Sequence, residues 1–280
     1  MSGEPIDALL VFSDIHSGCQ MALVPPDGSP LDNGGRYMPS LFQQKLWGWW
    51  HEFTTQWVPH VMGDRRWVVV NNGDTLDGRH HNNTTTWTTN LSDMVRNAYE
   101  LLAPAIEAWG VPYYHIRGTE AHGGQAGEDE ERLAGKLGAV PNGIGQHARY
   151  ELLKWLGDEF SLVHILHHIG TTSSTAYEST AVLKELVDMY TEGAQWRERP
   201  PDVVVRSHRH RPIKVELPTI NERAFAIVTP GWQGKTPLVH RIAGARVKQP
   251  VFGGVAIILS DEGEHYSRQY VRRLERPAAE

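Results

Sequence analysis

Aspartate, glutamate and histidine side chains stand just after short apolar runs at five places along this chain. A short apolar run predicts a buried strand, so each of these groups follows the end of an expected strand. In chain order, the groups are Asp14, His16, Asp74, Glu120, His122, His167, His168, His208 and His210. Imidazole suits Zn, Fe, Mn and Ni, and carboxylate suits Mn and Mg. The pattern therefore predicts a site for divalent metal ions.

Two of these motifs repeat a donor at every second residue. If the strand geometry continues into the motif, Asp14 and His16 face the same side, and so do His208 and His210. The carboxyl edge of the strands is also where α/β folds place their ligands. Asp74 is suited to bridging, because each carboxylate oxygen can hold one ion. Two ions about 3.5–4 Å apart clamp a phosphate and lower the pKa of a shared water.

Strands that alternate with helices are expected to position these donors. The expected strands lie at residues 8–12, 67–70, 113–116, 161–166, 202–205, 213–217, 225–228, 255–259 and 266–271. One expected helix begins at a capping box at Ser40–Gln43, and three others are expected at residues 91–109, 128–137 and 175–196. Alternation of this kind, followed by a run of strands, predicts an α/β protein with mixed sheets. We expect one domain over residues 1–280.

Composition narrows the functional class. The net charge of −6 does not favour a nonspecific nucleic-acid binder, although bound metal ions can supply local positive charge. The only cysteine, Cys19, excludes an intrachain disulfide and fits a reducing compartment. The first residues lack the features of a signal peptide, and no apolar run approaches the ~20 residues of a membrane span. We therefore expect a cytoplasmic protein that does not enter a membrane.

Together the motifs resemble those of the calcineurin-like metallophosphoesterase family, whose order is DxH, GD, GNH(E/D), H and GHxH. The matching segments are Asp14-x-His16, Gly73-Asp74, Gly118-Thr119-Glu120-Ala121-His122, His167-His168 and His208-x-His210. The resemblance implies a four-layer α/β/β/α sandwich of two mixed sheets flanked by helices. It also implies two divalent ions, with Mn favoured over Fe, Zn, Ni or Mg, and hydrolysis of a phosphate-ester substrate. A phosphodiester is favoured over a monoester, and nucleic acid is a candidate substrate.

The resemblance also implies a role for each donor. Asp14, His16 and His210 would hold the first ion, and Asp74 would bridge to the second. The second ion would take His208 and either His167 or His168. Both of these neighbours remain candidates, with a preference for His168 because the loop begins after it.

The chain departs from the family pattern at two positions. Ser207 replaces the glycine of GHxH, and Thr119 stands where the family has a metal-binding asparagine. Glu120 is a candidate ligand in its place. His122 comes two residues later than the family histidine and is a candidate acid that protonates the leaving oxygen. The GTxAH form resembles a branch found among phage and bacterial relatives.

Other polar residues have a functional and a structural interpretation. Arg117 and Arg209 flank the motifs and are candidates for phosphate contacts, or for surface pairs with acids. His81 is a candidate substrate contact or part of an exposed turn, and Asp77 is a candidate brace of the site. Buried, hydrogen-bonded roles are favoured for His115 and His164, and a core or lid role is favoured for the tryptophan-rich helix after Ser40.

Overall fold

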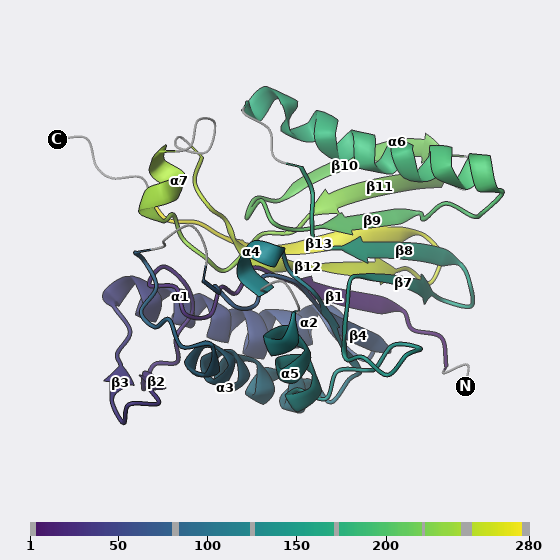
Figure 1. Cartoon of the computed structure of the whole chain (residues 1–280). Coiled ribbons are helices and arrows are strands. Elements are labelled where there is room, and N and C mark those ends of the chain that lie inside the picture. The colour runs from purple at the N-terminus through teal and green to yellow at the C-terminus, as the bar shows by residue number, and fades with distance from the viewer. Residues whose placement is uncertain are drawn as a thin grey trace.

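The computed structural model contains two mixed β-sheets stacked face to face, with helices on both outer sides (Figure 1). The structure describes residues 4–79, 84–123, 127–170, 174–219, 222–241 and 248–275. This arrangement confirms the predicted four-layer α/β/β/α sandwich. No helix among the described residues is both long and apolar enough to cross a membrane.

The first sheet has the strand order β13-β12-β1-β4-β5-β6. Strands β1, β4, β5 and β6 run parallel to one another, while β12 runs antiparallel to both of its neighbours, β1 and β13. Their bounds are β1 (Ala8–Phe12), β4 (Trp67–Asn72), β5 (Tyr113–Ile116), β6 (Ala148–Arg149), β12 (Phe252–Leu259) and β13 (His265–Arg272). The carboxyl ends of β1, β4 and β5 therefore meet at one edge.

The second sheet has the strand order β10-β11-β9-β8-β7. Strands β8, β9 and β11 are parallel, and the two outer strands are antiparallel to their neighbours. Their bounds are β7 (Glu151–Leu156), β8 (Ser161–Leu166), β9 (Val203–Arg206), β10 (Ile213–Thr219) and β11 (Glu222–Val228). A separate two-stranded ribbon pairs β2 (Ser29–Pro30) with β3 (Arg36–Tyr37).

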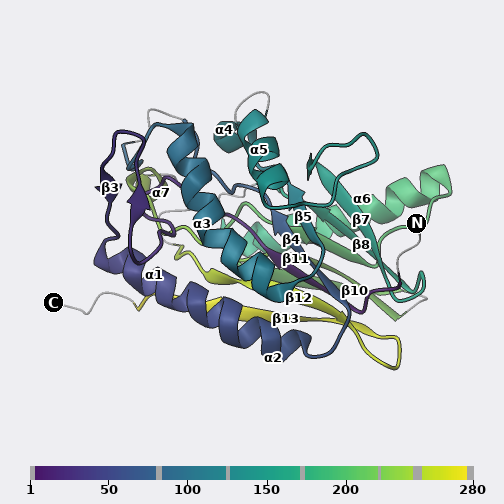
Figure 2. The same cartoon turned by 90° about the horizontal axis from the view of Figure 1, so that it is seen from below.

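Helices cover the outer face of each sheet (Figures 1 and 2). The first sheet is covered from below by α1 (Leu41–Glu52), the π-helical segment Phe53–Trp57, α2 (Val58–Met62), α3 (Leu91–Trp109) and α5 (Glu128–Lys136). On the second sheet, α6 (Glu178–Trp196) follows the short 3-10 turn Thr175–Tyr177 and packs on β10 and β11. The short helices α4 (Glu120–Gly123) and α7 (Pro237–Arg241) lie near one end of the sandwich.

Alternation along the central strands explains the layers. Leu9 and Val11 point into the core between the sheets, while Leu10 points into the core beneath α1 and α3. In β9, Val203 and Val205 face the first sheet, and Val204 faces α6. Strands buried on both faces read as continuous apolar runs, which is why the sequence located them.

The tryptophan-rich helix belongs to the core, as the sequence favoured. Trp50 and Phe53 are buried against Trp232, with ring centroids 5.0 Å and 5.5 Å from it. The capping box is present, since the Ser40 side chain accepts from the Gln43 N–H and the Gln43 side chain accepts from the Ser40 N–H. This helix therefore supports the first sheet.

Candidate metal centre

Loops from both sheets converge at the carboxyl edge of the parallel strands. The loop after β1 runs beside the loop after β4, because the Asp14 N–H donates to the Gly73 carbonyl and the His16 N–H to the Asp74 carbonyl, both at 3.0 Å. Within the second sheet, the loops after β8 and β9 are joined in the same way, since the Ser207 N–H donates to the His167 carbonyl at 2.9 Å. These main-chain contacts bring donors that are distant in sequence into one cluster.

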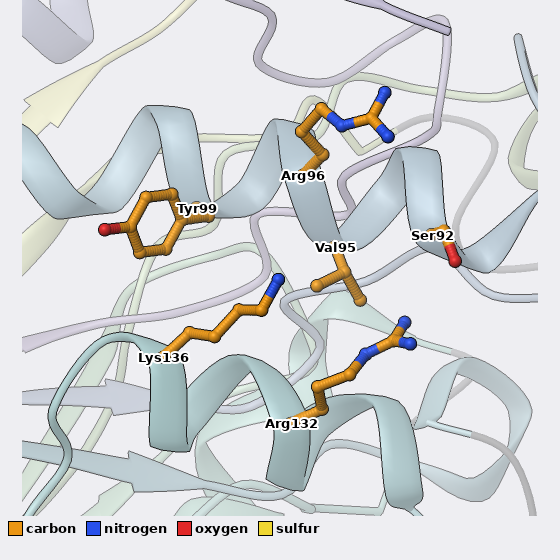
Figure 3. Close-up of a pocket in the computed structure, with 6 residues that line it drawn as sticks. All are labelled: Ser92, Val95, Arg96, Tyr99, Arg132 and Lys136. Carbon is orange, nitrogen blue, oxygen red and sulfur yellow. The ribbon is translucent and has the colours of Figure 1, made fainter. Parts of the chain in front are cut away.

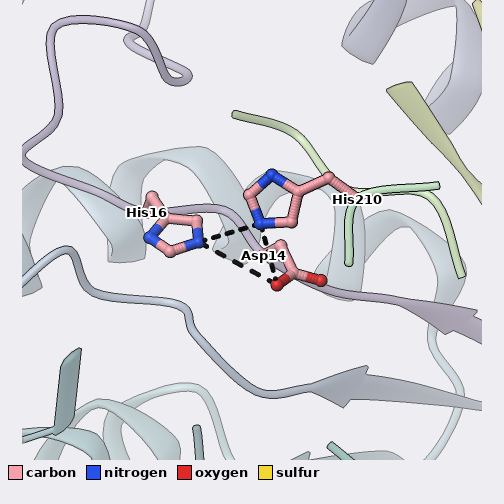
Figure 4. Close-up of side chains that lie close together, drawn as sticks. All are labelled: Asp14, His16 and His210. Carbon is pink, nitrogen blue, oxygen red and sulfur yellow. Dashed lines mark hydrogen bonds and ion pairs between the residues drawn. The ribbon is translucent and has the colours of Figure 1, made fainter. Parts of the chain in front are cut away.

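The first group of donors joins the two sheets (Figure 4). Asp14 and His16 follow β1, and His210 follows β9. His210 Nε2 lies 3.1 Å from Asp14 Oδ1 and 3.2 Å from His16 Nε2, and His16 Nε2 lies 3.9 Å from Asp14 Oδ1. This is the set that the resemblance assigned to the first ion.

A second group centres on Asp74. Its Oδ2 lies 3.0 Å from His167 Nε2 and 3.5 Å from His208 Nδ1. His122 lies between the two groups, with its Nε2 3.9 Å from Asp74 Oδ2 and its ring 4.5 Å from the ring of His16. The three sets overlap, so the donors form one continuous cluster.

Each carboxylate has one oxygen held by the protein and one turned toward the imidazoles. Asp14 Oδ2 accepts from the Ser13 hydroxyl at 2.5 Å, while Oδ1 is buried without a hydrogen bond. Asp74 Oδ1 accepts from the N–H and hydroxyl of Thr119 at 2.7 and 3.1 Å, while Oδ2 is buried and has no hydrogen bond from the residues that the structure describes. Asp74 Oδ2 and Asp14 Oδ1 are therefore the carboxylate oxygens that face the imidazoles.

Outer hydrogen-bond partners fix the orientation of the imidazoles. His167 Nδ1 bonds the Asn72 carbonyl at 2.6 Å, and His122 Nδ1 bonds the Asp77 carbonyl at 2.7 Å. His16 Nδ1 lies 3.3 Å from Asp77 Oδ1, and this contact is an ion-pair distance and not a hydrogen bond. A carbonyl at Nδ1 holds the proton there, so in the neutral rings of His167 and His122 the lone pair of Nε2 faces the cluster. This is the arrangement of metal-binding histidines.

The donor set fits a divalent ion. Two donors about 2.1 Å from one ion lie about 3.0 Å apart at an octahedral angle and about 3.4 Å apart at a tetrahedral angle. The separations of 3.0, 3.1 and 3.2 Å match this spacing, and the separations of 3.5 and 3.9 Å are longer. Buried polar atoms normally have hydrogen-bond partners. Five ring or carboxylate atoms of the cluster residues have none among the described residues: Asp14 Oδ1, Asp74 Oδ2, His167 Nε2, His208 Nδ1 and, on the outer side, His16 Nδ1.

Charge and burial act against each other in the cluster. Burial raises the pKa of Asp14, but the charge of His210 outweighs it and lowers the pKa to about 2. Burial likewise opposes ionisation of Asp74, yet the charges of His167 and His122 hold its pKa well below the usual range. Burial lowers the pKa of His167, but Asp74 overcomes it and raises the pKa to about 9. Both carboxylates are thus ionised and ready to bind a cation.

The backbone at the donors is left-handed. Among described non-glycine residues, seven have positive φ, and five of these are donors: Asp14, His16, Asp74, His208 and His210. The paired donors therefore reach one cluster through alternating left-handed residues beyond the strand ends, and not through continued strand geometry. Such conformations cost of order 1–3 kcal/mol each and gather at functional sites.

Of the two candidates, the structure places His167 and not His168 in the donor cluster. Val163 and Ile165 face the core between the sheets, and the same alternation turns His167 inward. His167 is buried beside Asp74, whereas His168 is exposed and touches the cluster only through its ring, 5.0 Å from that of His208. The alternation of inward-facing residues along β8 could have indicated His167 from the sequence.

Glu120 lies outside the donor cluster. It begins α4, is exposed, and belongs to none of the donor groups found among the described residues. Thr119 instead holds Asp74, a role that the sequence did not reveal. His122, three residues after Thr119, is the residue of this motif that lies in the donor cluster.

Both arginines proposed as phosphate contacts have hydrogen-bond partners within the protein. Arg117 is buried, and it donates to the Gly127 carbonyl at 2.7 Å and to Glu131 at 3.1 Å. Arg209 donates to the main-chain carbonyls of Gly170 and Glu178. Both therefore hold loops, because neighbouring acceptors take up their guanidinium groups. His81 lies outside the described residues.

The two strand histidines are packed and hydrogen-bonded, as favoured. His115 Nδ1 lies 2.7 Å from the Tyr113 hydroxyl, and His164 lies 3.3 Å from both Glu151 and Arg206. A separate small pocket between α3 and α5 is lined by Ser92, Val95, Arg96, Tyr99, Arg132 and Lys136 (Figure 3). It contains none of the donors.

Comparison with known proteins yields only distant likenesses. No family model matches the chain, and no curated protein matches it. A predicted phosphoesterase from Streptococcus pneumoniae TIGR4 is similar at 10% identity and a TM-score of 0.33, over 96% of this chain and 100% of that one. Vps29 from Chaetomium thermophilum is similar at 10% identity and a TM-score of 0.37, over 98% and 100%. Scores this low carry no argument, so the functional case rests on the site itself.

Proposed function

We propose that this protein hydrolyses phosphate esters with two divalent metal ions held at the carboxyl edge of its strands. The observation that supports this most is the set of buried donor atoms without hydrogen bonds, which face one another across the two sheets. Ions held there would polarise a bound phosphate and lower the pKa of a water between them.

The residues divide naturally between two ions. Asp14, His16 and His210 would hold the first, as in Figure 4. Asp74, His167 and His208 would hold the second, and Asp74 would bridge the two ions. Manganese is the favoured metal, because mixed imidazole and carboxylate sets suit it. The order of these motifs in the sequence places the chain with the calcineurin-like metallophosphoesterases as part of this proposal.

His122 is proposed as the proton donor to the leaving oxygen. Its Nδ1 is held by the Asp77 carbonyl, so its Nε2 is directed toward Asp74 and the donor cluster. A group in this position can hand a proton to an oxygen leaving from a phosphate bound there. Its replacement by glutamine should lower the rate of turnover while leaving both ions bound.

A phosphodiester substrate is favoured over a monoester, with nucleic acid as one candidate. Arg117 and Arg209 are occupied by carbonyls and by Glu131, so neither guanidinium is placed to balance the second charge of a monoester dianion. Turnover of single-stranded DNA, a cyclic nucleotide, bis-p-nitrophenyl phosphate and p-nitrophenyl phosphate would rank these classes. Faster turnover of the monoester would contradict the preference.

The decisive experiment is turnover by protein loaded with Mn²⁺. Hydrolysis that disappears in Asp74→Asn, with the fold preserved by circular dichroism, is the expected result. A second function is favoured by one observation: Thr119 holds Asp74 where the family pattern has an asparagine ligand. That alternative is a metal-binding scaffold without activity, and it predicts bound metal with no turnover of any of these esters.

A further inference from the structure

Asp77 lies at the junction of the two halves of the cluster without belonging to it. It is fully buried in the loop after β4, three residues beyond Asp74. Its carboxylate Oδ1 lies 3.3 Å from His16 Nδ1, and its main-chain carbonyl lies 2.7 Å from His122 Nδ1. One residue therefore contacts the outer nitrogens of two imidazoles that come from different loops.

A third contact ties Asp77 to the loop on the opposite side. The Gln233 side chain donates to Asp77 Oδ1 at 3.3 Å, and a hydrogen bond to the Gln233 main chain helps to raise the pKa of His210. The loop at Gln233 thus meets both Asp77 and His210. This arrangement links the outer side of the first donor group into a single network.

We infer that Asp77 is a positioning residue that fixes the His16 ring for the first metal ion through its carboxylate and the His122 ring through its carbonyl. This inference rests on the proposed function. A carboxylate at the outer nitrogen of a metal-binding imidazole fixes the ring orientation and strengthens the ligand. The two roles use different atoms of one residue, so a side-chain substitution separates them.

Main-chain contacts that do not involve the carboxylate also position this loop. The Asp77 N–H donates to the Ser17 carbonyl at 2.9 Å, and this main-chain bond fixes the segment. Gly78, at a φ of +68°, packs so closely on His122 that an added Cβ would lie 2.3 Å from the His122 carbonyl oxygen. The His122 contact should therefore persist when the side chain of Asp77 is changed.

The test compares Asp77→Ala and Asp77→Asn with the wild type and with Asp93→Ala. Asp93 is a matched control, since it is a buried aspartate in α3 whose carboxylate accepts from the Asp32 N–H and the Thr88 hydroxyl. Ring-nitrogen NMR of the metal-free protein reports the tautomer of His16, and calorimetric titration with Zn²⁺ reports the affinity of each ion.

In the wild type and in Asp77→Asn, we expect the His16 proton on Nδ1, because asparagine keeps an acceptor oxygen. Asp77→Ala should lose this preference and bind the first Zn²⁺ about 10–100-fold more weakly. Asp93→Ala should change neither the tautomer nor the affinity, and the second ion should be unaffected throughout.

A wild-type His16 with its proton on Nε2 would overturn the inference without any variant. An unchanged tautomer and affinity in Asp77→Ala would also overturn it, as would an equal loss of affinity in Asp93→Ala. A wild type that binds no Zn²⁺ would instead refute the proposed function, and the tautomer would still test the orientation of His16.

Discussion

Metal binding at the second donor group should become tighter as the pH rises. The pKa of His167 is about 9 in the metal-free protein, because Asp74 outweighs the effect of burial. Its Nε2 must lose a proton before it can bind an ion. The apparent affinity should then rise about tenfold per pH unit below the pKa, or ~100-fold between pH 6 and pH 8.

Calorimetric titration with Mn²⁺ in buffers of different ionisation enthalpy measures both the affinity and the number of protons released. About one proton should leave His167 for each ion bound at this group. His167→Gln should remove that proton release, and His168→Gln should retain it because His168 is exposed outside the donor groups. A flat pH dependence, or equal proton release in His167→Gln, would refute the reasoning.

The raised pKa of His167 also affects the stability of the metal-free protein, which should decrease as the pH rises although metal affinity increases. A raised pKa in the folded state means that His167 stabilises the fold fully below pH 6.5, and that this contribution is lost as the pH rises through about 9. The size is at most about 3 kcal/mol, since each pKa unit corresponds to 1.36 kcal/mol. Urea unfolding of metal-free protein at pH 6 and pH 9, compared with His167→Gln, measures this loss.

Three further changes test the surroundings of the cluster. Gly118→Ala places a Cβ 2.2 Å from Asp74 Oδ1. Metal affinity measured by calorimetric titration should therefore fall more than ~10-fold, and the free energy of unfolding should fall by about 1–3 kcal/mol. In the control Gly48→Ala, the added Cβ has nothing within 4 Å, so the affinity should stay unchanged. Thr119→Val should cost about 1.5–3 kcal/mol in urea unfolding through loss of the hydroxyl bond to Asp74, and Thr119→Ser should restore it; equal stability of the two variants would contradict this role. Burial lowers the pKa of His115 to about 3, so stability should fall as the pH drops below 6.5, by about 2 kcal/mol at pH 5, and His115→Gln should remove this component.

The sequence located most of the fold because the central strands are buried on both faces. Residues 8–12, 113–116 and 161–166 match β1, β5 and β8, and residues 91–109 match α3 with its Asn90 cap and Gly110 end. Strand β7 was missed because it is an edge strand, where Leu153 is exposed and Leu152 is buried. Its weak alternation carries little of the signal that a continuous apolar run provides.

The donors could be predicted from residue type and order, but their geometry could not. The left-handed backbone at Asp14 and Asp74 has no signature in the sequence, since neither residue is a glycine. The bond from Thr119 to Asp74 depends on where α4 begins, a boundary that residue preferences do not fix. Asp77 was only a weak candidate, because its contacts reach across loops that follow different strands.

The donor cluster spans the interface between the sheets, and this has a consequence for the order of folding. His16 and His210 are 194 positions apart, and Asn72 and His167 are 95 apart, so both pairs require distant parts of the chain. No ion can find its full set of donors until the two sheets have docked. If the sheets dock after the rate-limiting step, metal should leave the rate of folding unchanged and slow only unfolding. Once bound, the ions would act as a cross-link that holds the sheets together at one end.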